Sequence, residues 1–143
     1  VEAGAAVNQA CNEGTTPLFM ASQEGHPECV WLLLEAGAAI NQAPQNGATP
    51  LFMACEEGHL KCVRLLLEAG AAVDQASEDG TTPLAIACQL GHVEIARLLL
   101  EASAAVNQAM NNGATPLLIA CQEGHLEVAK LLSSYGASRA AAA

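Results

Sequence analysis

Apolar and polar positions along the chain follow a pattern that recurs every 33 residues. The tripeptide Thr-Pro-Leu begins at positions 16, 49, 82 and 115, and the dipeptide Gly-His begins at positions 25, 58, 91 and 124. No insertion breaks either series, and residues 14–46 and 47–79 are identical at 22 of 33 positions. Strict repetition with this period predicts an array of small structural units, each packed on its neighbours.

Each unit is predicted to contain two short helices followed by a loop. In the first unit, residues 17–24 form the first helix: the Thr16 hydroxyl can cap it, and Pro17 suits its first position. Residues 27–36 form the second helix, and Gly37 supplies the left-handed residue that closes it. Neither helix is long enough to be stable alone, so the apolar positions are expected to be buried between units.

The pattern assigns the chain, residues 1–143, to one domain. Its four units are residues 14–46, 47–79, 80–112 and 113–139, with residues 140–143 as a tail. Residues 1–13 match the loop end of a unit whose helices are absent, and the sequence begins without Met, so a piece of a longer or processed protein is expected. Ser133 and Ser134 replace the Leu-Glu of the other units, which indicates a polar terminal cap.

The shared residues resemble those of the ankyrin repeat. Thr-Pro-Leu, Gly-His, Leu-Leu, Gly-Ala and Asn recur at the 33-residue step over essentially the whole chain. The resemblance implies an all-α solenoid of stacked antiparallel helix pairs, with β-hairpin-like fingers projecting from one edge. It also implies a non-enzymatic module that binds proteins through its fingers and first helices.

Two positions depart from the family pattern. The residue after Thr-Pro-Leu, usually His in the family, is Phe19, Phe52, Ala85 or Leu118, so packing is expected to replace the hydrogen bonds of that His. Ser103 stands where the other repeats have a closing glycine. Because a side chain in the left-handed conformation costs roughly 1 kcal/mol, the third repeat is expected to have the weakest helix end.

Composition narrows the classes of function. The chain carries 5 Lys or Arg and 15 Asp or Glu, and its net charge of −10 argues against nucleic acid and anionic membrane as partners. No uncharged apolar run approaches the ~18 residues of a membrane-spanning helix. Cys55, Cys88 and Cys121 take equivalent positions in successive repeats, too far apart for disulfides, and reduced buried thiols favour an intracellular protein. Cys11, in a finger, is expected to be the most reactive thiol.

No arrangement of residues indicates catalysis, a metal or a cofactor. All four histidines occupy the Gly-His position, so they are interpreted as structural residues that cap the second helix and hydrogen-bond between repeats. His26 with Cys29, and His59 with Cys62, have the spacing of half a zinc site. Because the third and fourth repeats carry Ile and Val in place of that cysteine, Cys29 and Cys62 are interpreted as small hydrophobic residues.

Charge is divided between the two sides of the predicted array. Lys61, Arg64, Arg97 and Lys130 lie on second helices and Arg139 in the tail, whereas the fingers and the ends of the first helices carry acids. A groove of one sign attracts ligands of the other, so this inner surface is predicted to bind a protein partner through a basic segment. The alternative is a merely solvated surface. The predicted contact residues are Asn12, Glu13, Thr15, Gln23, Glu24, Gln45, Asn46, Glu56, Glu57, Glu78, Asp79, Thr81, Gln89, Leu90, Asn111, Asn112, Gln122 and Glu123.

Two features predict weak self-association. Trp31 takes a position that holds a cation in the other repeats, so it is expected on the outer side as a candidate contact residue. Because residues 1–13 lack helices, Leu18, Val30 and Leu33 are expected to be under-covered, and an uncapped repeat end tends to associate.

Two other interpretations of function stay open. The near-identity of the repeats also fits an engineered or consensus-like scaffold without a natural ligand, although irregular residues such as Pro27, Trp31 and Ser103 favour a natural origin. The array also fits a structural part of a larger protein in which another domain acts.

Overall fold

The computed structural model describes residues 7–11 and 14–137, and this part of the chain forms eight α-helices and no β-strand. Each repeat contributes two helices, as predicted. The first helices are α1 (Pro17–Glu24), α3 (Pro50–Glu57), α5 (Pro83–Leu90) and α7 (Pro116–Gln122). The second helices are α2 (Pro27–Glu35), α4 (Leu60–Glu68), α6 (Val93–Glu101) and α8 (Leu126–Ser134).

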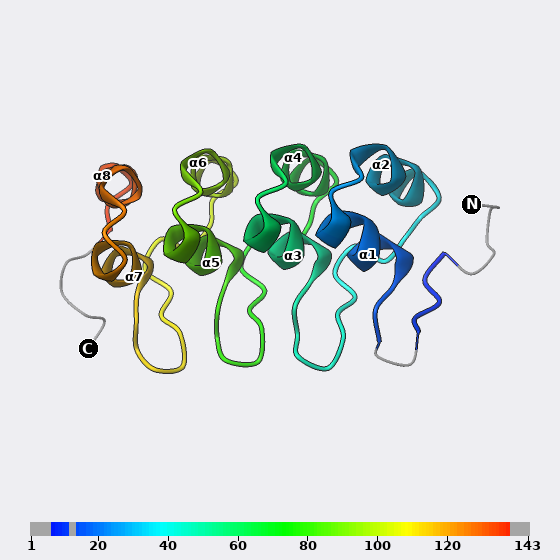
Figure 1. Cartoon of the computed structure of the whole chain (residues 1–143), viewed down its shortest axis with the longest axis horizontal. Coiled ribbons are helices and arrows are strands. Elements are labelled where there is room, and N and C mark those ends of the chain that lie inside the picture. Colours follow the sequence, from blue (N-terminus) through cyan, green and yellow to red (C-terminus); the bar gives the residue numbers. More distant parts are fainter. Residues whose placement is uncertain (1–6, 12–13, 138–143) are drawn as a thin grey trace.

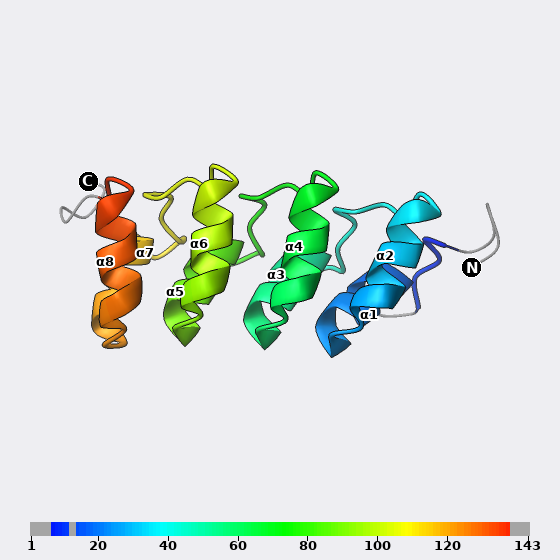
Figure 2. The ribbon, with the colours of Figure 1, turned by 90° about the horizontal axis from the view of Figure 1, so that it is seen from above.

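The helices form two rows (Figure 1). The first helices make one row, from whose side the loops between repeats project as fingers, and the second helices make the other row. Seen from above, the second helices lie side by side along the array (Figure 2). Each helix contacts its partner in the same repeat and the nearest helix of its own row in the next repeat. The predicted all-α solenoid is confirmed.

Local residues set where the helices begin and end. The hydroxyl oxygens of Thr16, Thr49, Thr82 and Thr115 each accept a hydrogen bond from the backbone N–H three residues later, at 3.0–3.2 Å. The proline after each threonine takes the first helical position, where a missing N–H costs no hydrogen bond. The second helix of the first repeat ends one residue before the predicted end, and the glycine that closes it is left-handed, as predicted.

The histidines connect repeats but do not cap helices. Nε2 of His59 lies 3.0 Å from the carbonyl oxygen of Gln23, and Nε2 of His125 lies 3.0 Å from that of Gln89. Because a carbonyl oxygen only accepts, each ring N–H donates to the preceding repeat. No histidine side chain bonds the helix that follows it, so the capping prediction is wrong. The ring is turned toward the neighbouring repeat, whereas good caps are short side chains that accept locally.

The buried apolar side chains form one continuous core from α1 to α8. Leu18, Val30 and Leu33 belong to it and are buried, so the prediction that they are under-covered is wrong. The two helices of the first repeat pack on each other and on the second repeat, which is enough to cover them. The large apolar residues that the first repeat exposes are Met20 and Leu32, together with Trp31.

The thiols do not all share one environment. Cys55, Cys62 and Cys88 are buried, but Cys29 and Cys121 are exposed. The expectation of buried thiols is therefore wrong for these two. Within the described residues no repeat precedes the first or follows the fourth, so the neighbour that covers the equivalent thiols is missing at each end.

The fingers are hydrogen-bonded turns. They comprise residues 41–48, 74–81 and 107–114 and the described part of residues 8–15. In the 74–81 finger, the Ser77 N–H donates to the carbonyl oxygen of Thr81 at 2.9 Å, and the Glu78 N–H donates to that of Asn46 in the preceding finger at 2.8 Å. The fingers therefore present a connected surface instead of separate loops.

Ser103 adopts the left-handed conformation that glycine has in the other repeats, with a φ of 71°. We expect Ser103→Gly to raise the free energy of unfolding by about 1 kcal/mol, because the side-chain penalty disappears. Gly70→Ser is the matched reverse substitution at a position with open space around it, and it is expected to lower that free energy by a similar amount. Urea denaturation measures both, and no change in either variant would contradict the argument.

Ser22 has a buried hydroxyl for which the described residues supply no hydrogen-bond partner. The equivalent residues Cys55 and Cys88 are buried, and burying a thiol costs less free energy than burying a hydroxyl that has no hydrogen-bond partner. We expect Ser22→Cys to raise the free energy of unfolding by about 1 kcal/mol, seen as a higher melting temperature. Ser133→Cys, at an exposed position, is the control and should change it little. A lower melting temperature for Ser22→Cys would show that the hydroxyl is satisfied.

Candidate partner-binding groove

The inner side of the array contains a groove of about 380 Å³ between the first helices and the fingers. The helices α1 and α3 line one side, and the 41–48 and 74–81 fingers line the other. Five lining residues were predicted as contact residues: Gln23, Asn46, Glu56, Glu78 and Asp79. Five were not: Phe19, Ala48, Phe52, Met53 and Ser77.

The groove has an apolar floor and an acidic rim. Phe19, Phe52 and Met53 are buried, whereas Glu56 is half-buried and the two finger carboxylates are exposed. No Lys or Arg is among the lining residues. Sequence reasoning missed the floor because Phe and Met on a short helix have the pattern of core residues.

Asp79 is held by the turn to which it belongs. Its Oδ1 accepts hydrogen bonds from the hydroxyl of Ser77 at 2.6 Å, from the hydroxyl of Thr81 at 2.7 Å and from the N–H of Thr81 at 3.1 Å. These bonds lower the pKa of Asp79, so its carboxylate stays charged. Thr81, which was also predicted as a contact residue, is buried and supports this turn.

Glu56 has no compensating charge within the groove. Burial, and then the neighbouring carboxylate of Glu57, raise the pKa of Glu56. Both effects disfavour the ionised form, and a cation placed beside it would favour that form. A Lys or Arg side chain brought beside Glu56 would therefore stabilise its ionised form.

The other predicted contact residues lie in the fingers and at the ends of the first helices. Asn112 accepts a hydrogen bond from the Ala114 N–H at 2.9 Å, and the Asn111 side chain donates to the carbonyl oxygen of Glu78 at 3.0 Å, so both shape the fingers. Asn12 and Glu13 lie outside the described residues. The remainder are exposed or partly exposed: Thr15, Glu24, Gln45, Glu57, Gln89, Leu90, Gln122 and Glu123.

The cations lie away from the groove. Every Lys and Arg in the described part of the chain is on a second helix, and Arg139 lies outside that part. Arg97 pairs with Glu94 at 3.6 Å and Lys130 with Glu127 at 3.9 Å, each within one helix. All four side chains are exposed, and such pairs contribute little to stability.

Trp31 lies on the outer side, as predicted, with about half of its surface exposed. It borders a hollow of about 530 Å³ that reaches from α2 to Lys61 and Leu65 on α4.

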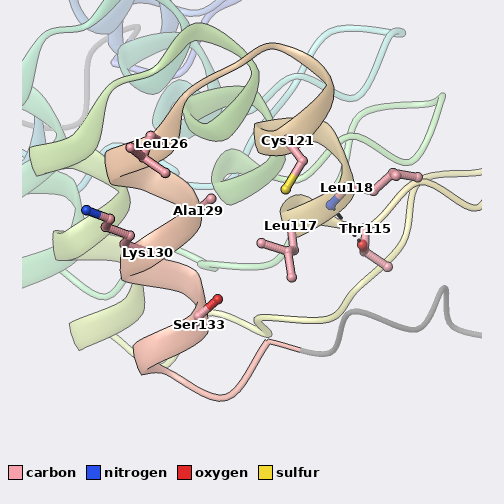
Figure 3. A pocket seen from close by; sticks show the side chains of 8 residues that line it. All are labelled: Thr115, Leu117, Leu118, Cys121, Leu126, Ala129, Lys130 and Ser133. Carbon is pink, nitrogen blue, oxygen red and sulfur yellow. Dashed lines mark hydrogen bonds between the residues drawn. The ribbon is translucent and has the colours of Figure 1, made fainter.

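A larger hollow of about 710 Å³ lies on the fourth repeat, between α7 and α8 (Figure 3). Leu118 and Leu126 are exposed there, so the prediction of a polar cap at this end is wrong. Ser133 and Ser134 replace residues only at the end of α8 and leave the rest of this surface apolar.

Among the residues that the structure describes, no three His, Cys, Asp or Glu side chains come together as a metal ion would require. No helix in the same residues is long and apolar enough to cross a membrane.

Comparison with known proteins adds one finding. A family model described as ankyrin repeats (3 copies) matches residues 1–77 and 69–141. A search of curated proteins found no match.

Proposed function

Because the chain belongs to the ankyrin-repeat family, we propose that it binds a partner protein by seating a Lys- or Arg-bearing segment in the acidic groove. Ankyrin repeats are generally protein–protein interaction modules, and the family is typically non-enzymatic. The proposal that the partner contributes a basic segment rests on the composition of the groove. The groove has an apolar floor and three carboxylates, and no Lys or Arg is among its lining residues.

A basic side chain has the two parts that this groove can bind, an apolar stem and a charged head. Lys and Arg have an apolar stem and a charged head, and they bury the stem where the head can reach polar surroundings. Here the stem would pack on Phe19, Phe52 and Met53 while the head approaches Glu56 and Glu78. The negative charge of the groove also attracts a basic segment before contact, which raises the association rate.

Charge reversal in the groove tests the proposal. The probe is a fluorescent peptide of about eight lysines, whose binding to the full chain is followed by anisotropy. We expect the variant E56K/E57K/E78K to bind it about tenfold more weakly or worse, because attraction at the rim becomes repulsion. Asp79 is left unchanged because it holds the finger turn.

A second triple variant, E35K/E68K/E101K, is the matched control. These glutamates are exposed at the ends of second helices, and either triple variant changes the net charge from −10 to −4. We expect the control to lose less than about threefold in affinity. Equal losses in the two variants would show that overall charge binds the peptide and would overturn the proposal.

Salt and pH provide two more readouts of the same complex. Affinity is expected to fall as salt rises from about 50 to about 500 mM, because salt screens the attraction. It is also expected to fall as the pH is lowered through the raised pKa of Glu56, since the protonated carboxyl no longer attracts a cation. An affinity that does not respond to salt would contradict the proposal.

A further inference from the structure

Hydrogen-bond acceptors are free on both sides of the groove. Glu56 belongs to α3 on one side, and Glu78 and Asp79 belong to the 74–81 finger on the other. Among the described residues, nothing bonds the carboxylates of Glu56 and Glu78. The bonds that Ser77 and Thr81 give to Asp79 all go to Oδ1, so its Oδ2 can still accept.

The same lining residues supply few donors. The Ser77 hydroxyl is already used, because it donates to Asp79 at 2.6 Å. Among the side chains that line the groove, the amide groups of Gln23 and Asn46 carry the remaining polar hydrogens. A groove rich in acceptors and poor in donors best fits a ligand group that donates several hydrogen bonds and accepts none. Guanidinium, with five N–H donors, and ammonium, with three, are such groups.

The backbone at the tip of the 74–81 finger is engaged by the neighbouring fingers. The Glu78 N–H donates to the carbonyl oxygen of Asn46, and the carbonyl oxygen of Glu78 accepts from the Asn111 side chain. The carbonyl oxygen of Asp79 accepts from the Asn111 N–H at 3.1 Å. A partner is therefore recognised here through side-chain contacts with the carboxylates, and not as an added strand on the finger backbone.

On the basis of the proposed function, on which this step rests, we infer that the groove selects arginine over lysine in the partner segment. A guanidinium is planar and carries its five N–H groups along its edges. It can therefore bond Glu56 from α3 and Glu78 or Asp79 from the finger at the same time. An ammonium is a compact charge whose three donors leave a single atom, so it serves carboxylates on two sides less well.

The floor of the groove favours the same side chain. Phe19, Phe52 and Met53 are buried except for the edges that line the groove. A guanidinium is more weakly hydrated than an ammonium and packs flat on aromatic and apolar surfaces, so moving it out of water costs less free energy. Glu56 is half-buried, and a cation that bonds it must give up part of its own hydration.

Peptides of equal charge test the preference. Fluorescent peptides of about eight arginines or about eight lysines are titrated with the full chain, and anisotropy gives each affinity. We expect the arginine peptide to bind at least about fivefold more tightly. Because acidic surfaces elsewhere on the chain can also bind arginine, the ratio of the two affinities is compared between variants.

The variant E56Q/E78Q removes one carboxylate from each side of the groove and leaves Asp79 to hold its turn. The matched control is E35Q/E68Q, at exposed positions on second helices, and either double variant changes the net charge from −10 to −8. We expect the preference for arginine to fall below about twofold in E56Q/E78Q and to stay unchanged in the control. Circular dichroism verifies that both variants are folded.

A third peptide separates hydrogen bonding from charge. In asymmetric dimethylarginine, methyl groups replace two of the five N–H hydrogens and the positive charge remains. A peptide of these residues is expected to bind about as weakly as the lysine peptide, because it can no longer donate fully to both sides of the groove. An affinity equal to that of the unmodified arginine peptide would overturn the inference.

The remaining outcomes separate the choice of arginine from the proposed function. If the two peptides bind equally and both weaken in E56K/E57K/E78K, the groove binds basic segments without selecting arginine, so only the inference fails. A preference that survives in E56Q/E78Q, or that the control variant also loses, places its origin outside the groove and overturns the inference too. If neither peptide responds to E56K/E57K/E78K, the proposed function fails together with it.

Discussion

Leu66→Ala is expected to lower the free energy of unfolding by about 2–5 kcal/mol. Leu66 lies on α4 in the middle of the array, and its side chain is fully buried. The substitution removes apolar contacts and leaves a cavity between helices that neighbouring repeats hold in place, so the site cannot collapse to fill it. Because each repeat also depends on its neighbours for stability, the loss is expected to weaken both adjacent junctions.

Urea denaturation followed by circular dichroism measures this effect, in dilute protein so that contacts between copies do not contribute. Leu126→Ala is the matched control, because it removes the same atoms from a side chain that is 62% exposed. Its expected change is within about 0.5 kcal/mol. Similar losses in the two variants would contradict the burial that the structure assigns to them.

Thiol labelling is expected to divide the cysteines sharply. Burial raises the pKa of Cys88 to about 12 from an ordinary value of 9.0, and burial also places the pKa of Cys55 well above its usual range. The thiolate is the reactive form, and at neutral pH the shift lowers the thiolate fraction of Cys88 about a thousandfold, so Cys88 is expected to react slowly. Cys11, Cys29 and Cys121 are exposed and are expected to react first.

Timed labelling with a thiol reagent, followed by digestion and mass spectrometry, measures each rate. In denaturant all the cysteines should react at similar rates, which controls for local sequence. Cys121 and Cys88 hold equivalent positions in adjacent repeats, so the contrast between them isolates the effect of a covering repeat. Equal rates for these two in the folded protein would show that the fourth repeat is covered or that the third is open.

The groove shows which parts of a binding site can be predicted from the sequence. Its acidic rim could be predicted, because Glu56, Glu78 and Asp79 are acids at finger and first-helix positions that vary between repeats. Its floor could not, because Phe19 and Phe52 have the pattern of buried residues and are indeed buried. Only the placement of two helices beside a finger shows that the edges of these rings line a groove. Thr81 shows the converse, since it is polar in the sequence but its side chain is fixed inside a turn.

The sequence by itself determined the repeat, its two helices and their ends. These depend on short-range interactions: a threonine that caps, a proline at the first helical position, and a residue that accepts the left-handed conformation, as Ser103 does. The tertiary structure alone decided which side chains are covered. Leu18 and Met20 lie two residues apart on α1, yet Leu18 is buried and Met20 is exposed. Whether a side chain at an end of the array is buried depends on the neighbouring repeat that its face meets. A sequence that repeats every 33 residues carries similar side chains at that position in each repeat, so it does not by itself show where such a neighbour is absent.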